Sequence, residues 1–511
     1  KNVMVVNMGL KSIRCIIFNQ NGLKLGSAAK AINTAINDKC VEQDPDEWWE
    51  KGILVVRKAL SDAGCPQINY ITVTTSASCL VCVDKYGNPL QKAFMISDKR
   101  ADSEAIEIKN MPEFGPVLEK TRLDMASSLM LPKIYWVKKH MPETFEKTQY
   151  FMSPNDFLLY KLTGKCVTDY LNAVKYHYDT DNKCYPEILL KKINIDIKKL
   201  PEVVEIGESI GTVSYTRKDV AEIFGLTTET EVVASSYDAI CSFIGSGVSE
   251  EGESSDVSGT VTVFRTLTRK KAAKTKKVYN IPYYSENANI IGGSNNLGGG
   301  LIEWVKQCYY LKDEYPYEIM EKEASESELG ARGLLFLPYL LGERTPVWDD
   351  SARGVFFGLE RMHTRKDMTR AVFESTGFID LSIIDAINEA GIDVNSVRLS
   401  GGLARINLVS QIKADILGKD VLVLSEFETT SSGAAMIVLA GQNVYPDLKS
   451  VADKFAVIRM IIKPNKENNK KYQYMYELYK DAYNMMKPLF KRRMEIVERL
   501  NNYKEIQIEN L

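Results

Sequence analysis

The sequence predicts an α/β protein of two large domains, and three observations lead to this fold class. At 511 residues the chain is too long for one hydrophobic core. Short apolar strands and amphipathic helices follow one another along it. A unit of strand, turn and strand near the start returns in the middle of the chain, which indicates an internal duplication. We therefore expect domains over 1–246 and 247–465, followed by a helical tail over 466–511.

Composition and charge favour a small molecule as the partner. Apolar residues make up 45% and charged residues 26%, which is typical of a soluble globular protein. The formal charge of -2 argues against binding to nucleic acid or to a membrane surface, because such proteins usually carry a basic excess. No long apolar run or leader pattern is found, so we expect a cytoplasmic protein with no membrane partner. A homodimer is compatible with this composition.

Cysteine and histidine usage disfavours metal and triad chemistry. Nine cysteines are dispersed, and the one close pair, Cys79 and Cys82, lies in an apolar run. A buried strand is favoured over a redox or zinc site for this pair, because no second pair or nearby histidine completes a ligand set. None of the three histidines lies near a plausible nucleophile in sequence, so triad hydrolysis is disfavoured.

The repeated unit is a pair of short strands joined by a polar turn. Its first copy has strands over 3–6 and 13–18 around the turn 7–12, and its second copy occupies 255–266. Two strands with so short a connection pair antiparallel, and their loop can face a ligand. We therefore predict a ligand loop near the start of each domain. The second of these turns consists of Ser258, Gly259 and Thr260.

Asp238 is the leading candidate for a catalytic group. It follows the apolar run 232–234 and two serines, and it opens the apolar segment 239–244. This pattern predicts a strand followed by a helix with the carboxylate at their junction. Rigid elements on both sides would hold such an acid in place while it stays accessible.

Asp98 and Arg100 lie two residues apart in the segment 97–100, where the sequence predicts the start of a helix. A carboxylate and a guanidinium at a helix entry can bind hydroxyl groups and can also pair with each other. An ordinary exposed helix start explains this spacing equally well, so both interpretations stay open.

Glycines cluster at two places in the second half of the chain. The segment 292–300 precedes a helix, and Gly401 and Gly402 lie between a short strand at 397–399 and another helix. Glycines let the backbone approach a phosphate or purine while the helix dipole faces it, although dense glycine is also common in plain turns. A helix over 434–440 opens with small residues and leads to the same place, which favours a nucleotide site.

Two charged segments are better explained by structure than by binding. The basic run 269–277 lies between strand signals and is typical of a solvated hairpin tip. The helix predicted over 470–500 carries tyrosines at helical spacing, which we interpret as packing against the body rather than as a nucleic-acid stacking face.

Taken in order, these loops resemble the FGGY family of carbohydrate kinases, and the xylulokinase branch most closely. The most specific segments are GLLFLPYLLGERTP at 333–346, ARG with FGL within 352–359, SGGLAR at 400–405 and QIKAD at 411–415. The resemblance covers nearly the whole chain. It implies two domains of the actin/hexokinase-like (ribonuclease H-like) fold with a central cleft, a small sugar or polyol as substrate, ATP as cofactor and Mg²⁺ between them.

The resemblance also assigns roles by position. It makes Asp238 the general base and a neighbour of the metal, and it places Ser78, Asp98, Arg100 and Asp238 against the sugar. Asn7 stands where the family has an acid near magnesium. The positions that would bind ATP are Gly9, Ser12, Arg14, Ser258, Gly259, Thr260, Gly298, Gly401, Gly402, Leu403 and Gly433.

Three departures from the family pattern bear on function. The first phosphate loop of the family opens Asp-x-Gly-Thr, whereas Asn7 and Leu10 remove the acid and the threonine hydroxyl here. The family's Gln-Met-His-Gly turn is replaced by 76–79, with Ser78 in place of the histidine. The glycines usual before the catalytic acid are Ser235 and Ser236.

The function predicted from these observations is ATP-dependent phosphorylation of a small sugar or polyol. The alternative is a non-catalytic or weakly active sugar-binding or regulatory protein on the same fold. Asn7 and Leu10 favour this alternative, whereas Asp238 and the glycine loops favour the enzyme.

Overall fold

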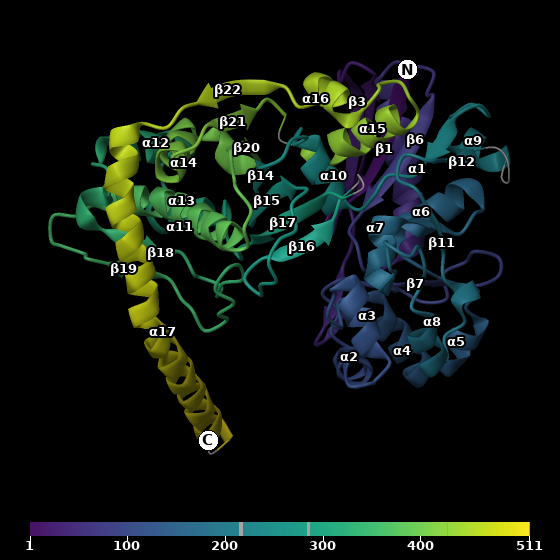
Figure 1. Cartoon of the computed structure of the whole chain (residues 1–511), viewed down its shortest axis with the longest axis horizontal. Coiled ribbons are helices and arrows are strands. Elements are labelled where there is room, and N and C mark those ends of the chain that lie inside the picture. The colour runs from purple at the N-terminus through teal and green to yellow at the C-terminus, as the bar shows by residue number, and fades with distance from the viewer. Residues whose placement is uncertain (214–217, 284–286, 427, 510–511) are drawn as a thin grey trace. The chain divides into compact units, whose positions relative to one another are not determined.

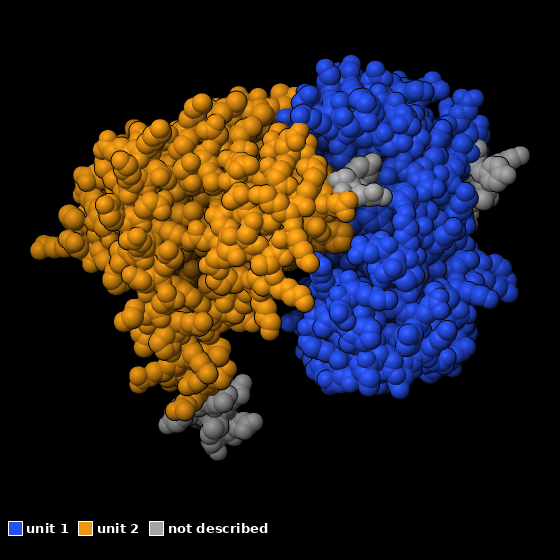
Figure 2. All heavy atoms as spheres, viewed as in Figure 1, with its two compact units in different colours: residues 1–247, 428–456 blue, residues 248–427, 457–511 orange. Residues whose placement is uncertain are grey.

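The computed structural model describes residues 1–213, 218–283, 287–426 and 428–509 (Figure 1). The chain forms two compact units, which Figure 2 colours separately. Unit 1 contains 1–247 and 428–456, and unit 2 contains 248–427 and 457–511. The sequence grouped 428–456 with the second domain, whereas the structure groups it with unit 1. Among the described helices, none is long and apolar enough to cross a membrane.

Unit 1 is an α/β unit with a six-stranded main sheet. Its strands are β1 (Asn2–Met8), β2 (Ser12–Asn19), β3 (Lys24–Ala31), β4 (Ala35–Asn37), β5 (Cys40–Gln43), β6 (Tyr70–Thr75), β7 (Val81–Val83), β8 (Ala93–Phe94), β9 (Tyr150–Met152), β10 (Val167–Asp169), β11 (Glu202–Val204), β12 (Ser209–Thr212) and β13 (Glu231–Val233). Its helices are α1 (Pro45–Asp62), α2 (Asp102–Lys109), α3 (Phe114–Thr121), α4 (Met130–His140), α5 (Pro142–Lys147), α6 (Pro154–Thr163), α7 (Tyr170–Ala173), α8 (Glu187–Lys192), α9 (Lys218–Phe224), α10 (Asp238–Gly245), α15 (Thr429–Gly441) and α16 (Leu448–Phe455), with 3₁₀ turns at Val174–Tyr176 and Ile197–Lys199.

The main sheet of unit 1 has the strand order β12-β13-β6-β1-β2-β3. β1 pairs antiparallel with β2, and it pairs parallel with β6, which in turn pairs parallel with β13. β6 is buried throughout, and β1 is buried except near its start. Both strands are therefore covered on both faces of the sheet, which explains their continuous apolar runs. The carboxyl ends of these three parallel strands meet at one edge of the sheet.

Two glycines explain why 428–456 joins unit 1. α10 and α15 cross so closely that a Cβ on Gly433 would lie 1.8 Å from the Cys241 carbonyl oxygen, and one on Gly245 would lie 1.8 Å from that of Thr429. Only glycine permits such a contact between helix backbones. The pairing joins elements far apart in the chain, which is why the sequence did not predict it.

Unit 2 is built on a seven-stranded sheet with the order β16-β17-β15-β14-β20-β21-β22. The strands of this unit are β14 (Glu253–Ser258), β15 (Thr262–Thr268), β16 (Tyr279–Pro282), β17 (Asn289–Ser294), β18 (Leu335–Leu337), β19 (Val355–Phe357), β20 (Ser396–Ser400), β21 (Val421–Leu424) and β22 (Ile458–Ile462). Its helices are α11 (Gly300–Tyr309), α12 (Pro316–Glu326), α13 (Arg365–Glu389), α14 (Asn407–Leu417) and α17 (Lys466–Glu509), with 3₁₀ turns at Ala331–Gly333 and Gly402–Arg405.

The two units share one core arrangement. In unit 2, β14 pairs antiparallel with β15 and parallel with β20, just as β1 pairs with β2 and β6 in unit 1. The turns 9–11 and 259–261 therefore occupy corresponding places. This correspondence agrees with the duplication inferred from the sequence pattern.

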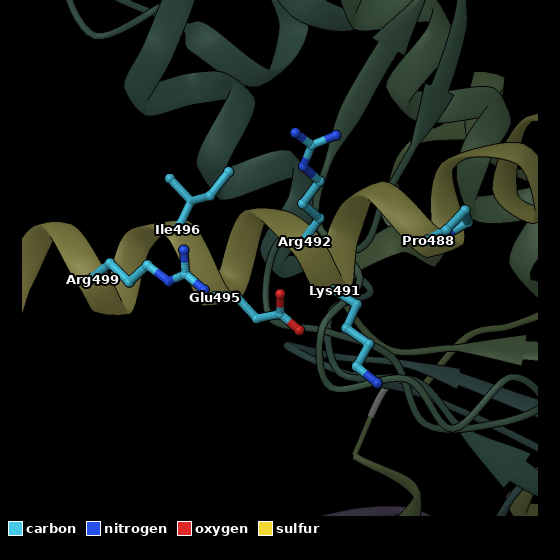
Figure 3. Close-up of a pocket in the computed structure, with 6 residues that line it drawn as sticks. All are labelled: Pro488, Lys491, Arg492, Glu495, Ile496 and Arg499. Carbon is cyan, nitrogen blue, oxygen red and sulfur yellow. The ribbon is translucent and has the colours of Figure 1, made fainter.

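The tyrosine stripe of α17 packs against unit 2, as the sequence predicted. Tyr472, Tyr476, Tyr479 and Tyr483 are all buried, and the hydroxyl of Tyr472 donates to Glu374 Oε1 at 2.8 Å. Farther along α17 the side chains are mostly exposed. Figure 3 shows this part of the helix, where a surface pocket is lined by Pro488, Lys491, Arg492, Glu495, Ile496 and Arg499.

Candidate active site

The carboxyl edge of the parallel strands in unit 1 brings together three groups from distant parts of the sequence. Asn7 lies near the end of β1 and is in register with Thr74 of β6. Ser76 follows β6, and its amide donates to the Met8 carbonyl at 3.2 Å. Asp238 follows β13 after a short loop. In open α/β sheets, ligands bind at this edge of the strands.

Asp238 is the first residue of α10, as the sequence predicted. Its Oδ1 accepts the Ala239 N–H at 2.7 Å, and its Oδ2 accepts the Ser76 hydroxyl at 3.1 Å. The residue is half-buried, and a carboxylate at a helix amino terminus is stabilised by the helix dipole. Asp238 is therefore held in a fixed orientation while part of it faces solvent, which suits a proton acceptor.

The two serines before Asp238 anchor its loop. Ser235 Oγ donates to the Val73 carbonyl at 2.6 Å, and Ser236 Oγ donates to Asp169 Oδ1 at 2.9 Å. Both serines are fully buried. Hydroxyl groups here tie the loop to β6 and to the start of α7, which glycines could not do. The departure from the family pattern thus adds two hydrogen bonds beneath the candidate base.

Two lysines that the sequence reasoning missed lie near this edge. Lys133 of α4 is fully buried, and it donates to the carbonyl of Ser78, whose φ of +61° is in the left-handed region. Burial lowers the pKa of Lys133 to about 8. Burial also lowers the pKa of Lys175, against the opposing charge of Asp238, and its Nζ lies 4.9 Å from the Tyr237 ring centroid. Neither lysine belongs to a recognisable local pattern.

Asp98 and Arg100 form a closed ion pair. Arg100 Nη2 lies 2.8 Å from Asp98 Oδ2 and 2.9 Å from Glu42 Oε1, and Asp98 Oδ2 also accepts the Val41 N–H at 2.8 Å. Asp98 is 1% exposed. The predicted helix start at 97–100 is wrong, because α2 begins only at Asp102. The carboxylate of Asp98 binds β5 and Arg100 instead of capping a helix.

Asn7 contacts the start of α15. Its Nδ2 donates to Glu428 Oε1 at 3.2 Å and to Ser431 Oγ at 3.1 Å. Glu428 is the residue before α15, and its other oxygen accepts the Ser431 N–H at 3.1 Å. Sequence reasoning missed Glu428 because 421 positions separate it from Asn7. On the neighbouring strand, Arg14 is in register with Asn7, and its Nη2 donates to Ser12 Oγ at 3.2 Å.

The predicted phosphate-loop glycines fall into two groups, and the first has open space beside it. A Cβ on Gly9, Gly259 or Gly402 would meet nothing closer than 4.0, 3.8 or 3.9 Å, respectively. None of the three has a positive φ. The packing of the chain therefore does not require glycine at these positions. Each leaves a space that a Cβ would enter, as close approach of a ligand to the backbone requires.

The other glycines are required by the protein's own packing. A Cβ on Gly298 would lie 2.2 Å from Thr262 Oγ1, and one on Gly401 would lie 2.5 Å from the Ser258 carbonyl oxygen. Gly298 N donates to the Thr260 carbonyl at 2.9 Å. These residues hold the glycine-rich segments of unit 2 against the turn after β14. Leu403 is buried in the core of this unit.

A buried ion cluster supports the same turn. Lys413 Nζ contacts Asp256, Asp380 Oδ2 at 2.7 Å and Ser258 Oγ at 3.1 Å. The Ser258 hydroxyl donates to Asp256 Oδ1 at 2.6 Å. Burial would lower the pKa of Lys413, but the two carboxylates outweigh it and raise that pKa. Burial, together with the charge of Asp256, holds the pKa of Asp380 well above its usual range. The sequence did not predict this cluster.

Comparisons with known proteins show the family of this chain. The N-terminal domain of the FGGY family of carbohydrate kinases matches residues 2–245, and the C-terminal domain of that family matches 256–441. A xylulose kinase of Bacillus subtilis is 29% identical over 96% of this chain and 98% of its own length. A gluconokinase of Bacillus licheniformis is 25% identical over 93% of this chain and 94% of its own length.

The fold is shared with solved structures along nearly the whole chain. A gluconate kinase from Lactobacillus acidophilus superposes with a TM-score of 0.86 at 23% identity, covering 96% of this chain and 99% of that one. A xylulose kinase from Rhodospirillum rubrum superposes with a TM-score of 0.87 at 22% identity, covering 96% of this chain and 100% of that one. The expected actin/hexokinase-like fold is thus confirmed. With both domain models matched in order, this chain belongs to the FGGY family of carbohydrate kinases.

Proposed function

We infer that this carbohydrate kinase transfers the terminal phosphoryl group of ATP to a hydroxyl group of a small sugar or polyol, with Asp238 as general base. The observation that carries this proposal is the position of Asp238 at the carboxyl edge of β13, β6 and β1, oriented by Ser76 and by the Ala239 amide. A carboxylate held there can accept the hydroxyl proton as the oxygen attacks phosphorus.

The glycine-containing loops of the two units suit the phosphates of a nucleoside triphosphate. The open positions Gly9, Gly259 and Gly402 let backbone amides approach phosphate oxygens, and Arg14 adds a positive charge on the strand beside Asn7. ATP would supply the phosphoryl group that is transferred. The residues we propose to hold it are Gly9, Ser12, Arg14, Ser258, Gly259, Thr260, Gly402 and Leu403. Gly298, Gly401 and Gly433 are explained by the protein's own packing instead.

The oxygen donors in unit 1 suit Mg²⁺, which prefers carboxylate and carbonyl ligands together with water. Asp238 and the amide oxygen of Asn7 are the donors expected from the sequence, and the structure adds Glu428 beside Asn7. Bound there, Mg²⁺ would neutralise charge on the phosphate oxygens.

For the sugar, we propose a pocket formed by Ser78, Asp98, Arg100 and Asp238, with Lys133 beneath Ser78. The pair of Asp98 and Arg100 is fixed by its own contacts and by Phe94, whose ring centroid lies 3.7 Å from the guanidinium carbon. Such fixed polar groups suit a small polyhydroxy compound. The relatives named above act on a ketose and on an aldonate, and a glycerol kinase of Lactobacillus acidophilus is also 28% identical over 89% of this chain.

An assay of ADP release with MgATP tests this proposal. Pentuloses, hexuloses, polyols and aldonates would each be supplied in turn, and we expect one class to stimulate ADP release above the rate without sugar. Asp238→Asn should remove that stimulation while ADP binding is kept. Absence of stimulation by every class, or full activity of Asp238→Asn, would contradict the proposal. The non-catalytic alternative rested on Asn7 and Leu10, and no further observation favours it.

A further inference from the structure

The side chain of Asn7 is oriented by its partners. A carboxylate can only accept hydrogen bonds, so the contact with Glu428 requires that the NH₂ group of Asn7 faces α15. Its second hydrogen then lies toward Ser431 Oγ at 3.1 Å. The amide oxygen of Asn7 is directed away from Glu428. Asn7 is 5% exposed, so this arrangement is fixed by its surroundings.

Glu428 is equally well placed. One of its oxygens accepts from Asn7 and the other from the Ser431 amide, which caps α15. The Thr429 hydroxyl lies 3.2 Å from Ser242 Oγ on α10, and the glycine contact between α10 and α15 fixes the helix start. Glu428 is half-buried. A carboxylate is therefore held within hydrogen-bond distance of the position where the family's acid is missing.

An amide at position 7 leaves a single carboxylate at this place. If residue 7 were aspartate, two carboxyl groups would lie at hydrogen-bond distance and would repel each other. The amide of Asn7 instead donates a hydrogen bond to Glu428 and orients it. With an amide at position 7, the carboxylate available here is that of Glu428.

We propose that Glu428 supplies the negative charge of the metal and phosphate region in this chain, and that Asn7 is the positioning residue that orients it. This inference rests on the proposed kinase function. It differs from the expectation drawn from sequence, in which the loss of the acid at position 7 favours a non-catalytic or weakly active protein. Here the carboxylate that matters to the metal comes from the start of α15.

The test is a cycle of three variants: Glu428→Gln, Asn7→Asp and the double variant with both changes. Isothermal titration of Mn²⁺ and Mg²⁺ into the purified protein saturated with ADP gives the metal affinity without turnover. Glu428→Gln should weaken metal binding by about 10-fold to 100-fold, the usual range when a group that orients a metal site is lost. Asn7→Asp alone should give no gain.

The double variant is decisive because it moves the carboxylate from position 428 to position 7. It should recover metal affinity to within about three-fold of the parent, since one charge and one amide donor are again paired. Asp447→Asn is the matched control. Asp447 caps α16 in the same unit by accepting the Ser450 amide at 2.8 Å, so it removes a capping carboxylate away from the site and should leave metal affinity unchanged.

The inference would be overturned by an unchanged affinity in Glu428→Gln, by a double variant as weak as Glu428→Gln, or by a parent–ADP complex that binds no metal. A gain of metal affinity in Asn7→Asp alone would also overturn it, since it would show that Glu428 beside Asn7 does not already supply the negative charge that the metal needs. The metal titration is independent of the sugar. If the expected affinities are found while no sugar stimulates ADP release, the assignment of Glu428 stands and the proposed function fails.

Discussion

Corresponding turns of the two units are stabilised in different ways. The turn after β1 lies beside Asn7, whose side-chain amide donates to a hydroxyl and to a half-buried carboxylate. The turn after β14 rests on Lys413, Asp256 and Asp380, which are all buried at 0–1% exposure. The pairing of the strands is the same in both.

This difference separates residues that can act on a ligand, in unit 1, from residues that only stabilise the fold, in unit 2. Asp238 and Glu428 in unit 1 are only partly buried, so each can exchange a contact with the protein for one with a ligand. The cluster in unit 2 has no such freedom, because a buried charge that loses its partner costs several kcal/mol. Changes at these two carboxylates of unit 1 should therefore alter activity, and changes in the unit 2 cluster should alter stability.

The largest effect is expected for Asp238→Asn. Removal of the general base should lower turnover by about 100-fold to 10,000-fold. Because the amide still accepts the Ala239 N–H, the unfolding free energy should stay within about 1 kcal/mol of the parent. Steady-state kinetics and urea denaturation measure the two quantities. If Asp238→Asn lowers the unfolding free energy as well as turnover, the loss of activity would be explained by loss of stability, and the contrast between the two units would fail.

Lys413→Met should have the opposite profile. It leaves Asp256 and Asp380 buried together without their cation, which should destabilise the protein by about 3–5 kcal/mol. Urea denaturation followed by tryptophan fluorescence gives the change. Lys470→Met, at an exposed position on α17, is the control. A loss below about 1 kcal/mol for Lys413→Met would mean that the cluster contributes no more than a surface pair.

The buried lysine of unit 1 gives a pH-dependent prediction. Burial lowers the pKa of Lys133 from 10.5 to about 8. Below pH 8 this lysine is charged in both states, and burying the charge costs about 3 kcal/mol. Between pH 8 and 10.5 the unfolded chain binds more protons than the folded one, so the unfolding free energy rises with pH in this window.

The measurement is the difference between the parent and Lys133→Met in urea denaturation at a series of pH values. Groups common to both proteins cancel in this difference. We expect the parent to gain about 3 kcal/mol relative to the variant as pH rises from 7.5 to 10.5. Parallel curves for the two proteins would show that the ammonium group is not desolvated in the folded state.

Much of the fold could be predicted from patterns within short stretches of the sequence. Alternating and apolar runs located β1 and β2, because their signals lie within a few residues of one another. The position of Asp238 at the start of a helix was predicted in the same way. The failure at 97–100 is instructive, because the carboxylate of Asp98 accepts the N–H of Val41 on a distant strand, a contact that no local pattern shows.

Contacts between distant segments were beyond this reasoning. The partner of Asn7 is Glu428, which belongs to no local motif. Lys413 lies in the segment QIKAD, but nothing in that segment shows which carboxylates it pairs with. Burial determines their roles, and burial depends on which elements pack together. For the same reason the sequence treated all loop glycines alike, although the structure divides them by what a Cβ would meet.

The smallest effect tests that division with adjacent residues. Gly402→Ala should leave stability unchanged, since its Cβ would meet only the Ser258 carbonyl at 3.9 Å, and should weaken ADP binding by about 10-fold through loss of close approach. Gly401→Ala should instead destabilise the protein by about 1–3 kcal/mol, because its φ is +86° and its Cβ would lie 2.5 Å from the same oxygen. Calorimetric titration with ADP and urea denaturation give both quantities for each variant. If Gly402→Ala binds ADP as the parent does, the open space at Gly402 serves no nucleotide, and the glycine loop of unit 2 would be explained by packing alone.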